Sequence, residues 1–176
     1  MATRIAFLRG INLGGHNVKM ERLRELVARV GVTDVETFIA SGNVIFDAGG
    51  RTPRALESAI EAELAGSLGY EVATFVRTPA QLERLVAVDV FDERPGTLHA
   101  VFLKKKVPAA AYEELHALET VRDRLHVTGT EILWSTAGGF SEADIKIDAI
   151  TRILGRAPVT VRNIKTVRQL AERYGR

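Results

Sequence analysis

The sequence predicts a mixed α+β protein in which one succession of strands and helices occurs twice. Short apolar and β-branched runs alternate with segments of helical periodicity along all 176 residues. The first half gives the order β-α-β-β-α-β plus a trailing helix, and the second half repeats it. Each half also closes with a Val-Arg pair at the end of a strand and a Gln-Leu pair early in the next helix. A tandem repeat of two ferredoxin-like units (βαββαβ, an alpha/beta plait), each followed by an extra helix, explains this pattern better than one large sheet.

The first half is expected to hold four strands and three helices. In order, these are a strand at 4–11, a helix at 20–30, strands at 35–40 and 43–47, a helix at 53–68, a strand at 71–77 and a helix at 79–88. The first strand is predicted as buried because its apolar run is continuous. Thr52 and Thr78 are expected to cap the two later helices, since each precedes a proline at the first helical position. Gln81 completes a capping box with Thr78.

The second half follows the same plan. Its expected elements are a strand at 97–103, a helix at 109–118, strands at 124–127 and 131–136, a helix at 141–154, a strand at 159–162 and a helix from 166. Ser141 and Thr166 are predicted as the N-caps of the last two helices. The two domains are therefore expected at 1–90 and 97–176. The acidic, Pro- and Gly-containing segment 89–96 shows no periodicity and is the predicted linker.

Composition narrows the class of protein. The chain has no cysteine, which excludes disulfides and thiol chemistry and suits a reducing compartment, so a cytoplasmic location is expected. No apolar run approaches the length of about 18 residues that a membrane helix needs, so no membrane partner is expected. Its 24 basic and 22 acidic residues are interspersed. A net charge of +2 permits a nucleic-acid partner but does not argue for one.

A glycine-rich loop at residues 9–19, with a basic residue at each end, is the main candidate site. Glycines allow positive φ angles and close approach of a ligand, and the helix that follows supplies unpaired N–H donors. These features suit an anionic ligand. The loop matches neither known phosphate fingerprint, because a P-loop needs lysine where His16 stands and G-x-G-x-x-G is absent. The alternative is a tight strand-to-helix connection whose charges face water. The candidate binding residues are Arg9, Gly10, Asn12, Gly14, Gly15 and Lys19.

The expected topology brings further polar residues together in each half. The first strand of a ferredoxin-like unit lies between the third and the fourth and runs antiparallel to both. Arg9 and Gly10 should therefore lie near Ser41 and Asn43, which join the candidate site. By the same reasoning, residues 137–141 should lie near Arg162 and Asn163, giving a second cluster. Each cluster combines glycines, a helix N-terminus and an arginine, which are groups that bind anions and carboxylates. The alternative is that these residues only form turns and helix caps.

The motifs resemble one known family. Residues 9–15 (RGINLGG) with Lys19-Met20, residues 41–46 (SGNVIF), and Arg162-Asn163 with Thr166-Val167 and Leu170 are similar to those of the domain of unknown function 1697. The resemblance spans nearly the whole chain. It implies a two-part α/β fold with paired ferredoxin-like halves and implies no established activity.

The chain departs from this family's pattern near its end. The family has a lysine after the serine that corresponds to Ser141, where this chain has Glu142. It also has Trp and Asn where this chain has Ile164 and Lys165. A lysine and an aromatic residue that would contact a ligand are therefore missing. The second cluster is consequently the weaker of the two candidate sites.

Other chemistry finds little support in the sequence. The four histidines have no metal-site spacing, so no metal is expected. Ser41 has no evident base and no G-x-S-x-G elbow surrounds it. The acids of the 89–96 linker are interpreted as solvated charge. The run Lys104-Lys105-Lys106 is interpreted as a solvated edge. No residue pattern assigns a cofactor, a catalytic group or an oligomeric state.

Three functions remain open from the sequence. The preferred one is a binder of a small anionic ligand, such as a nucleotide or phosphate, on the glycine-rich loop. The second is an RNA-binding module, although residues 43–47 lack the paired aromatics of an RNA-recognition sheet. The third is an enzyme of unknown reaction that uses the same polar groups, for which no general base is evident.

Overall fold

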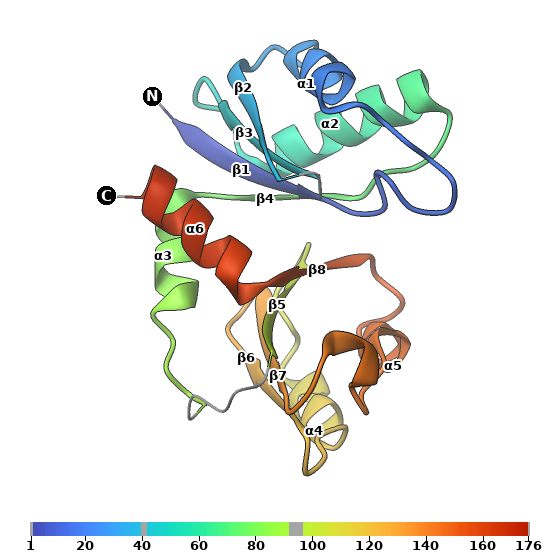
Figure 1. Ribbon diagram of the computed structural model, residues 1–176, viewed down its shortest axis with the longest axis vertical. Helices are drawn as coiled ribbons and strands as arrows, with labels where there is room; N and C mark the ends of the chain where they lie inside the picture. Colours follow the sequence, from blue (N-terminus) through green and yellow to red (C-terminus); the bar gives the residue numbers. More distant parts are fainter. Residues whose placement is uncertain (1, 40–41, 92–96, 176) are drawn as a thin grey trace. The chain divides into compact units, whose positions relative to one another are not determined.

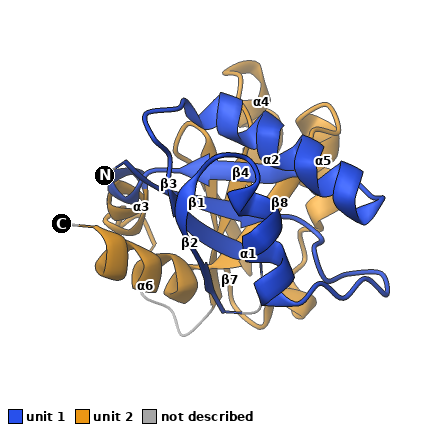
Figure 2. Cartoon of the chain, turned by 90° about the horizontal axis from the view of Figure 1, so that it is seen from above, with its two compact units in different colours: residues 1–81 blue, residues 82–176 orange. Residues whose placement is uncertain are grey.

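The computed structural model describes residues 2–39, 42–91 and 97–175. The chain divides into two compact units, residues 1–81 and 82–176, coloured blue and orange in Figure 2. The described residues form a mixed α+β fold with two four-stranded antiparallel sheets, one in each unit, and six α-helices. The boundary lies within α3 (Pro79–Val86), earlier in the chain than the predicted linker at 89–96. Residues 92–96 of that linker lie outside the described residues.

Unit 1 has its sheet in the order β2-β3-β1-β4, with β1 antiparallel to both of its neighbours (Figure 1). Its elements are β1 (Thr3–Leu8), α1 (Met20–Ala28), β2 (Thr33–Phe38), β3 (Asn43–Asp47), α2 (Pro53–Leu68) and β4 (Thr74–Arg77). Thr52 caps α2 through its hydroxyl, and Gly69 ends that helix at φ 80°. The capping box before α3 also forms, since Thr78 and Gln81 exchange hydrogen bonds of 2.8 and 3.1 Å. These predicted caps are confirmed.

The core of unit 1 lies between the sheet and the helices α1 and α2. Alternate strand residues such as Ala6, Val44 and Val76 face this core, where Leu26 and Ile60 project from the two helices. The intervening strand positions are buried as well, including Ile5, Phe7, Ile45 and Phe75. Burial on both faces explains why the first strand is apolar without alternation.

The edge strand β4 is protected by carboxylates of α2. Glu57 Oε1 accepts a 2.8 Å hydrogen bond from Val76 N, and Glu61 Oε1 accepts one of the same length from Thr74 N. Glu57 is 7% exposed and also lies 3.9 Å from the guanidinium of the buried Arg77. One turn of helix separates the two glutamates, which matches the two-residue spacing of outward N–H groups on the strand. The outer edge of β4 is therefore hydrogen-bonded instead of open for pairing.

Unit 2 repeats the strand arrangement with the order β6-β7-β5-β8. Its remaining elements are β5 (Thr97–Leu103), α4 (Ala110–His116), β6 (Asp123–Val127), β7 (Glu131–Thr136), a 3₁₀ turn (Phe140–Glu142), α5 (Ile147–Ile153), β8 (Val159–Asn163) and α6 (Ile164–Tyr174). The core beneath α4 and α5 contains Val101, Leu115, Ile132, Trp134 and Ile150. Helix α6 packs against β5 and β8.

Two predicted helix starts in unit 2 are wrong. Ser141 lies in the 3₁₀ turn and caps no α-helix, because α5 begins six residues later at Ile147. The buried Asp123 accepts a 2.7 Å hydrogen bond from Ile145 N, which fixes the chain before α5, and Lys146 is extended there. Thr166 is also not a cap, because Asn163 accepts a hydrogen bond from Lys165 N and starts α6 directly after β8.

Candidate functional site

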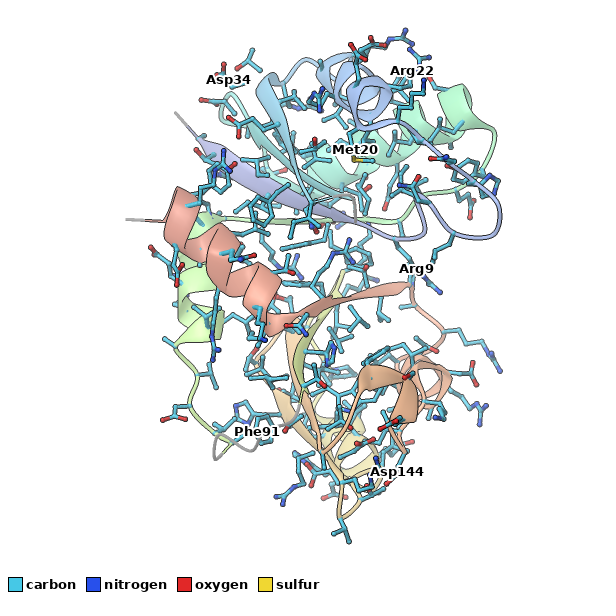
Figure 3. The ribbon with its side chains drawn as sticks, viewed as in Figure 1. Arg9, Met20, Arg22, Asp34, Phe91 and Asp144 are labelled. Atoms are coloured by element: carbon cyan, nitrogen blue, oxygen red, sulfur yellow. The ribbon has the colours of Figure 1, made fainter. Side chains whose placement is uncertain are left out.

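The glycine-rich loop of residues 9–19 leaves the sheet of unit 1 between β3 and β4. Leu8 N donates to Gly42 O and Arg9 N donates to Ala73 O, each across 2.8 Å. Figure 3 labels Arg9, which lies where β1 ends and the loop begins. The expected proximity of Arg9 to the turn before β3 is therefore observed, although Ser41 lies outside the described residues.

Gly42 is required at this turn for two reasons. Its φ angle of +75° is costly for other residues, and an added Cβ would lie 2.9 Å from Ile11 Cγ2 and 3.2 Å from Leu8 Cβ. The turn and the start of the loop are thus packed against each other. This contact fixes where the chain enters the loop.

The loop is held in shape by its own hydrogen bonds and by one distant residue. Asn12 Oδ1 accepts a 2.8 Å bond from Val18 N, which closes the loop across six residues. The Tyr70 hydroxyl donates to Ile11 O, and the Tyr70 ring stacks on His16 with the ring centroids 3.7 Å apart. The Asn12 carbonyl oxygen is therefore used inside the loop. No local sequence pattern predicts this role of Tyr70, because its hydrogen-bond partner Ile11 lies 59 positions earlier in the chain.

The loop presents backbone donors to solvent. Gly10, Gly14 and Gly15 have φ angles of 74°, 65° and 87°, and no atom would obstruct a Cβ at any of them, so conformation alone explains these glycines. Among the described residues, the N–H groups of Gly14, Gly15 and Asn17 have no acceptor. Lys19 occupies the N-cap position of α1 without a side-chain cap bond, so the first N–H groups of that helix are also open.

Arg9 and Lys19 are the two cations at the ends of this loop. Both are exposed, and neither side chain makes a hydrogen bond or ion pair within the part of the chain that the structure describes. Glu21, in the first turn of α1, is exposed and adds a negative charge nearby. The loop thus offers unused positive charge and unused N–H donors, which together are suited to an oxyanion.

Asn43 does not belong to this surface. Its side chain is fully buried, and its amide donates a 3.0 Å hydrogen bond to Phe38 O across the β2–β3 turn. The expectation that Asn43 lines a binding surface with Arg9 is therefore wrong, because the residue is used to close a hairpin. The Asn43 amide thus gives the Phe38 carbonyl a hydrogen bond inside the hairpin.

The second predicted cluster forms in unit 2, but its polar groups are engaged. Asn163 is opposite His99 in the β5–β8 register, and the Phe140 ring centroid is 4.6 Å from that of His99. Asn163 Oδ1 caps α6. Arg162 donates to Thr160 Oγ1 and to Val161 O, at 2.8 and 2.9 Å. Burial lowers the pKa of Arg162 to about 10, so the side chain stays charged at neutral pH.

Sequence reasoning missed a group of buried polar atoms in unit 2, two of which belong to rings beside Phe140, namely His99 and Trp134. His99 Nδ1, Trp134 Nε1, Thr136 Oγ1 and Asp123 Oδ1 are all buried, and none of them has a hydrogen-bond partner among the residues that the structure describes. They belong to adjacent strands, since His99 pairs with Trp134 and Asp123 pairs with Thr136. Desolvation lowers the pKa of His99, so the ring is neutral near pH 7. The alternation of Ile132 and Trp134 with Leu133 and Ser135 is the ordinary pattern of a strand with one buried face, so it gives no sign of this group.

Two further features bear on the kinds of site present. Within residues 2–39, 42–91 and 97–175, no three His, Asp or Glu side chains gather closely enough to hold a metal ion. No helix in the described ranges is long and apolar enough to cross a membrane.

Comparison with known proteins gives a family and a fold. The family model described as "Protein of unknown function (DUF1697)" matches residues 1–133. A solved structure of a conserved bacterial protein from Streptococcus pneumoniae is similar, with a TM-score of 0.73 and 19% identity, over 100% of this chain and 99% of that one. No curated protein sequence matches this chain.

Proposed function

We propose, from the premise that this chain belongs to the DUF1697 family of proteins of unknown function, that it binds a small ligand through one phosphate-like anionic group. The ligand would bind at the glycine-rich loop of residues 9–19. A nucleotide or a sugar phosphate has the required chemistry, and inorganic phosphate is the simplest probe of the anionic group.

The observation that carries this proposal is the pair of unpartnered cations at the ends of an ordered loop. Arg9 and Lys19 are exposed, and neither has an acceptor among the described residues. Arg9 would bind two oxygens of the anion with its planar guanidinium, and Lys19 would act as a point charge. The N–H groups of Gly14 and Gly15 would complete the contacts. Asn12 would position the loop through its bond to Val18 N.

Thermal unfolding with inorganic phosphate, nucleotides, sugar phosphates and short RNA tests this function. At one hundred times its dissociation constant, a site-bound ligand stabilises the fold by about 2.7 kcal/mol, which raises the melting temperature by several degrees. Arg9→Ala should abolish the shift. Arg54→Ala is the matched control, because Arg54 is another exposed arginine of unit 1 without a partner among the described residues.

The dependence on salt separates the two classes of ligand. A small anion at saturating concentration should keep much of its shift when salt is raised, whereas RNA bound through several phosphates should lose affinity steeply as counterions compete. A shift with RNA alone that is insensitive to Arg9→Ala would contradict the proposal.

We also propose that the two units are tandem repeats of one ferredoxin-like fold. Their strand orders agree, and so does their register, because Ala6 pairs with Val44 and Val76 as Val101 pairs with Ile132 and Val161. Two hydrogen bonds also correspond. Leu8 N donates to Gly42 O as Leu103 N donates to Thr130 O, and the Arg77 guanidinium binds Val76 O as that of Arg162 binds Val161 O. Superposition of two experimentally determined units, aligned at these pairs, would test the proposal.

A further inference from the structure

We propose that unit 2 holds a second binding site, for a ligand that joins an apolar body to one anionic group. The site is a pocket of about 770 Å³ between the end of β5 and the segment that connects α5 to β8. Its size lies in the range of small-molecule sites, roughly 300 to 1,000 Å³. This proposal concerns a different surface from the loop of residues 9–19 and does not depend on the function proposed there.

Most of the pocket wall is apolar. Leu103 at the end of β5 is 4% exposed, and Ile153 and Leu154 at the end of α5 are half-buried against the core of unit 2. Pro108, Ala157 and Pro158 are exposed and extend the wall toward solvent. Prolines and a core-anchored leucine change little on binding, so this wall is largely preformed. An apolar body placed here would be removed from water at a small conformational cost.

The polar side of the pocket has one sign of charge. Lys104, Lys105 and Lys106 line it, and no carboxylate is among its lining residues. Lys105 and Lys106 are exposed and have no partner within the described ranges of the chain. The positive charge of Lys105 and Lys106 beside an apolar wall selects an anion that carries an apolar body, and it disfavours a purely apolar ligand or a cation.

The backbone holds the three lysines in place. Leu103 N donates to Thr130 O across 2.9 Å, and Val107 N donates to Gly129 O across 3.0 Å, so the β6–β7 turn binds both ends of the lysine segment. Lys105 and Lys106 are solvated as expected, but the expected edge position is wrong, because β5 lies between β7 and β8. Protection of an open edge therefore does not account for them.

The C-terminal end of α5 repels an anion less than a helix end with unbonded carbonyl groups would. The carbonyls of Ile150, Thr151 and Arg152 accept hydrogen bonds from Leu154, Arg156 and Gly155, respectively. Because these carbonyl groups already accept hydrogen bonds, they present less partial negative charge to the pocket. Arg156 adds a further exposed cation in the same connection.

Binding of a fluorescent amphipathic anion to the full chain tests the proposal. The probe is anilinonaphthalene sulfonate, and phenyl naphthylamine, which lacks the sulfonate, is its uncharged counterpart. The double variant Lys105→Gln with Lys106→Gln should raise the dissociation constant of the sulfonate about tenfold, as expected for the loss of a charge-assisted contact. It should leave the affinity for the uncharged probe within twofold. Lys165→Gln, at an exposed lysine of the same unit, is the matched control and should change neither.

A second variant tests the place of binding. Ala157 is exposed and lines the pocket, so Ala157→Trp should fill it and abolish binding of both probes, with the thermal unfolding midpoint unchanged. Sulfonate binding that persists in Ala157→Trp would overturn the proposal, and so would a dissociation constant that the double lysine variant leaves within twofold. Arg9→Ala should have no effect on either probe, which separates this outcome from that of the phosphate experiment.

Discussion

The Tyr70 hydroxyl donates a 3.0 Å hydrogen bond to the backbone carbonyl of Ile11. This bond joins the segment after α2 to the start of the glycine-rich loop, and the stacking of Tyr70 on His16 adds a second contact. Desolvation raises the pKa of Tyr70, so the hydroxyl keeps its proton and remains a donor at neutral and moderately alkaline pH. The shape of the candidate site therefore depends on a residue outside it.

Tyr70→Phe should loosen the loop without removing the ring. The variant loses one hydrogen bond and leaves Ile11 O without its donor, which should lower the free energy of unfolding by about 1 kcal/mol. Urea unfolding measures this loss. Amide hydrogen exchange should also become faster at Gly14 and Gly15, while the strands of unit 1 keep their protection. Unchanged exchange throughout the loop would show that Tyr70 does not hold it.

Glu57→Ala should destabilise unit 1 strongly. The substitution leaves Val76 N without an acceptor at an otherwise protected strand edge and removes the carboxylate beside the buried Arg77. A loss of about 3 kcal/mol in unfolding free energy is expected. Glu63→Ala is the control, because Glu63 makes only a long, partly exposed ion pair of 3.5 Å with Arg29 and a surface hydrogen bond with Ser67, so the loss should be below about 1 kcal/mol. Equal losses in the two variants would contradict the role assigned to Glu57.

The parts of the fold that follow from local rules are those the sequence predicts well. Thr52 and Thr78 cap helices because the donors they satisfy lie within three residues. Ser141 is also a hydroxyl residue before a predicted helix, yet it caps no α-helix, because Asp123 of β6 binds the chain at Ile145. The competing interaction is tertiary, so no local pattern reveals it.

In the candidate site, too, local features can be predicted from the sequence and features that depend on tertiary contacts cannot. The glycines and cations of residues 9–19 are visible as a local pattern, and their role in binding stays a prediction. In the sequence, Asn43 looks as suitable for ligand binding as the loop residues. It is nevertheless buried, and this burial depends on how β2 and β3 pack. Tyr70 and the buried group around His99 arise from contacts between segments that are distant in the chain.

His99 should make unit 2 less stable in mild acid. Its folded-state pKa lies below the ordinary value of 6.5 because the ring is desolvated. Above pH 6.5 the ring is neutral in both the folded and the unfolded chain, so its titration does not change the free energy of unfolding. As the pH falls below 6.5 the unfolded chain takes up the proton first, so stability declines until the pH reaches the folded-state pKa. In His99→Phe this part of the decline should be absent. Parallel stability curves for the two proteins between pH 7 and 5 would contradict the assignment.

Glu21→Gln should strengthen the binding of phosphate. Glu21 is exposed in the first turn of α1, where it competes with an incoming anion for the same positive field. Its removal should lower the dissociation constant by about twofold to fivefold at low salt, and the gain should shrink as salt is raised. Calorimetric titration at two salt concentrations measures both effects. Glu25→Gln, one turn further along the exposed part of α1, should have a smaller effect.

The most direct test of the anion site is a titration of the ¹⁵N-labelled full chain with inorganic phosphate, followed by amide chemical shifts. The account predicts saturable shifts at Gly14, Gly15, Asn17 and Lys19, because their N–H groups face the proposed ligand. It also predicts that Arg9→Ala weakens this binding about tenfold while Arg54→Ala leaves it unchanged. Loop amides that do not move, or that move equally in wild type and Arg9→Ala, would contradict the claim that this loop binds an anion.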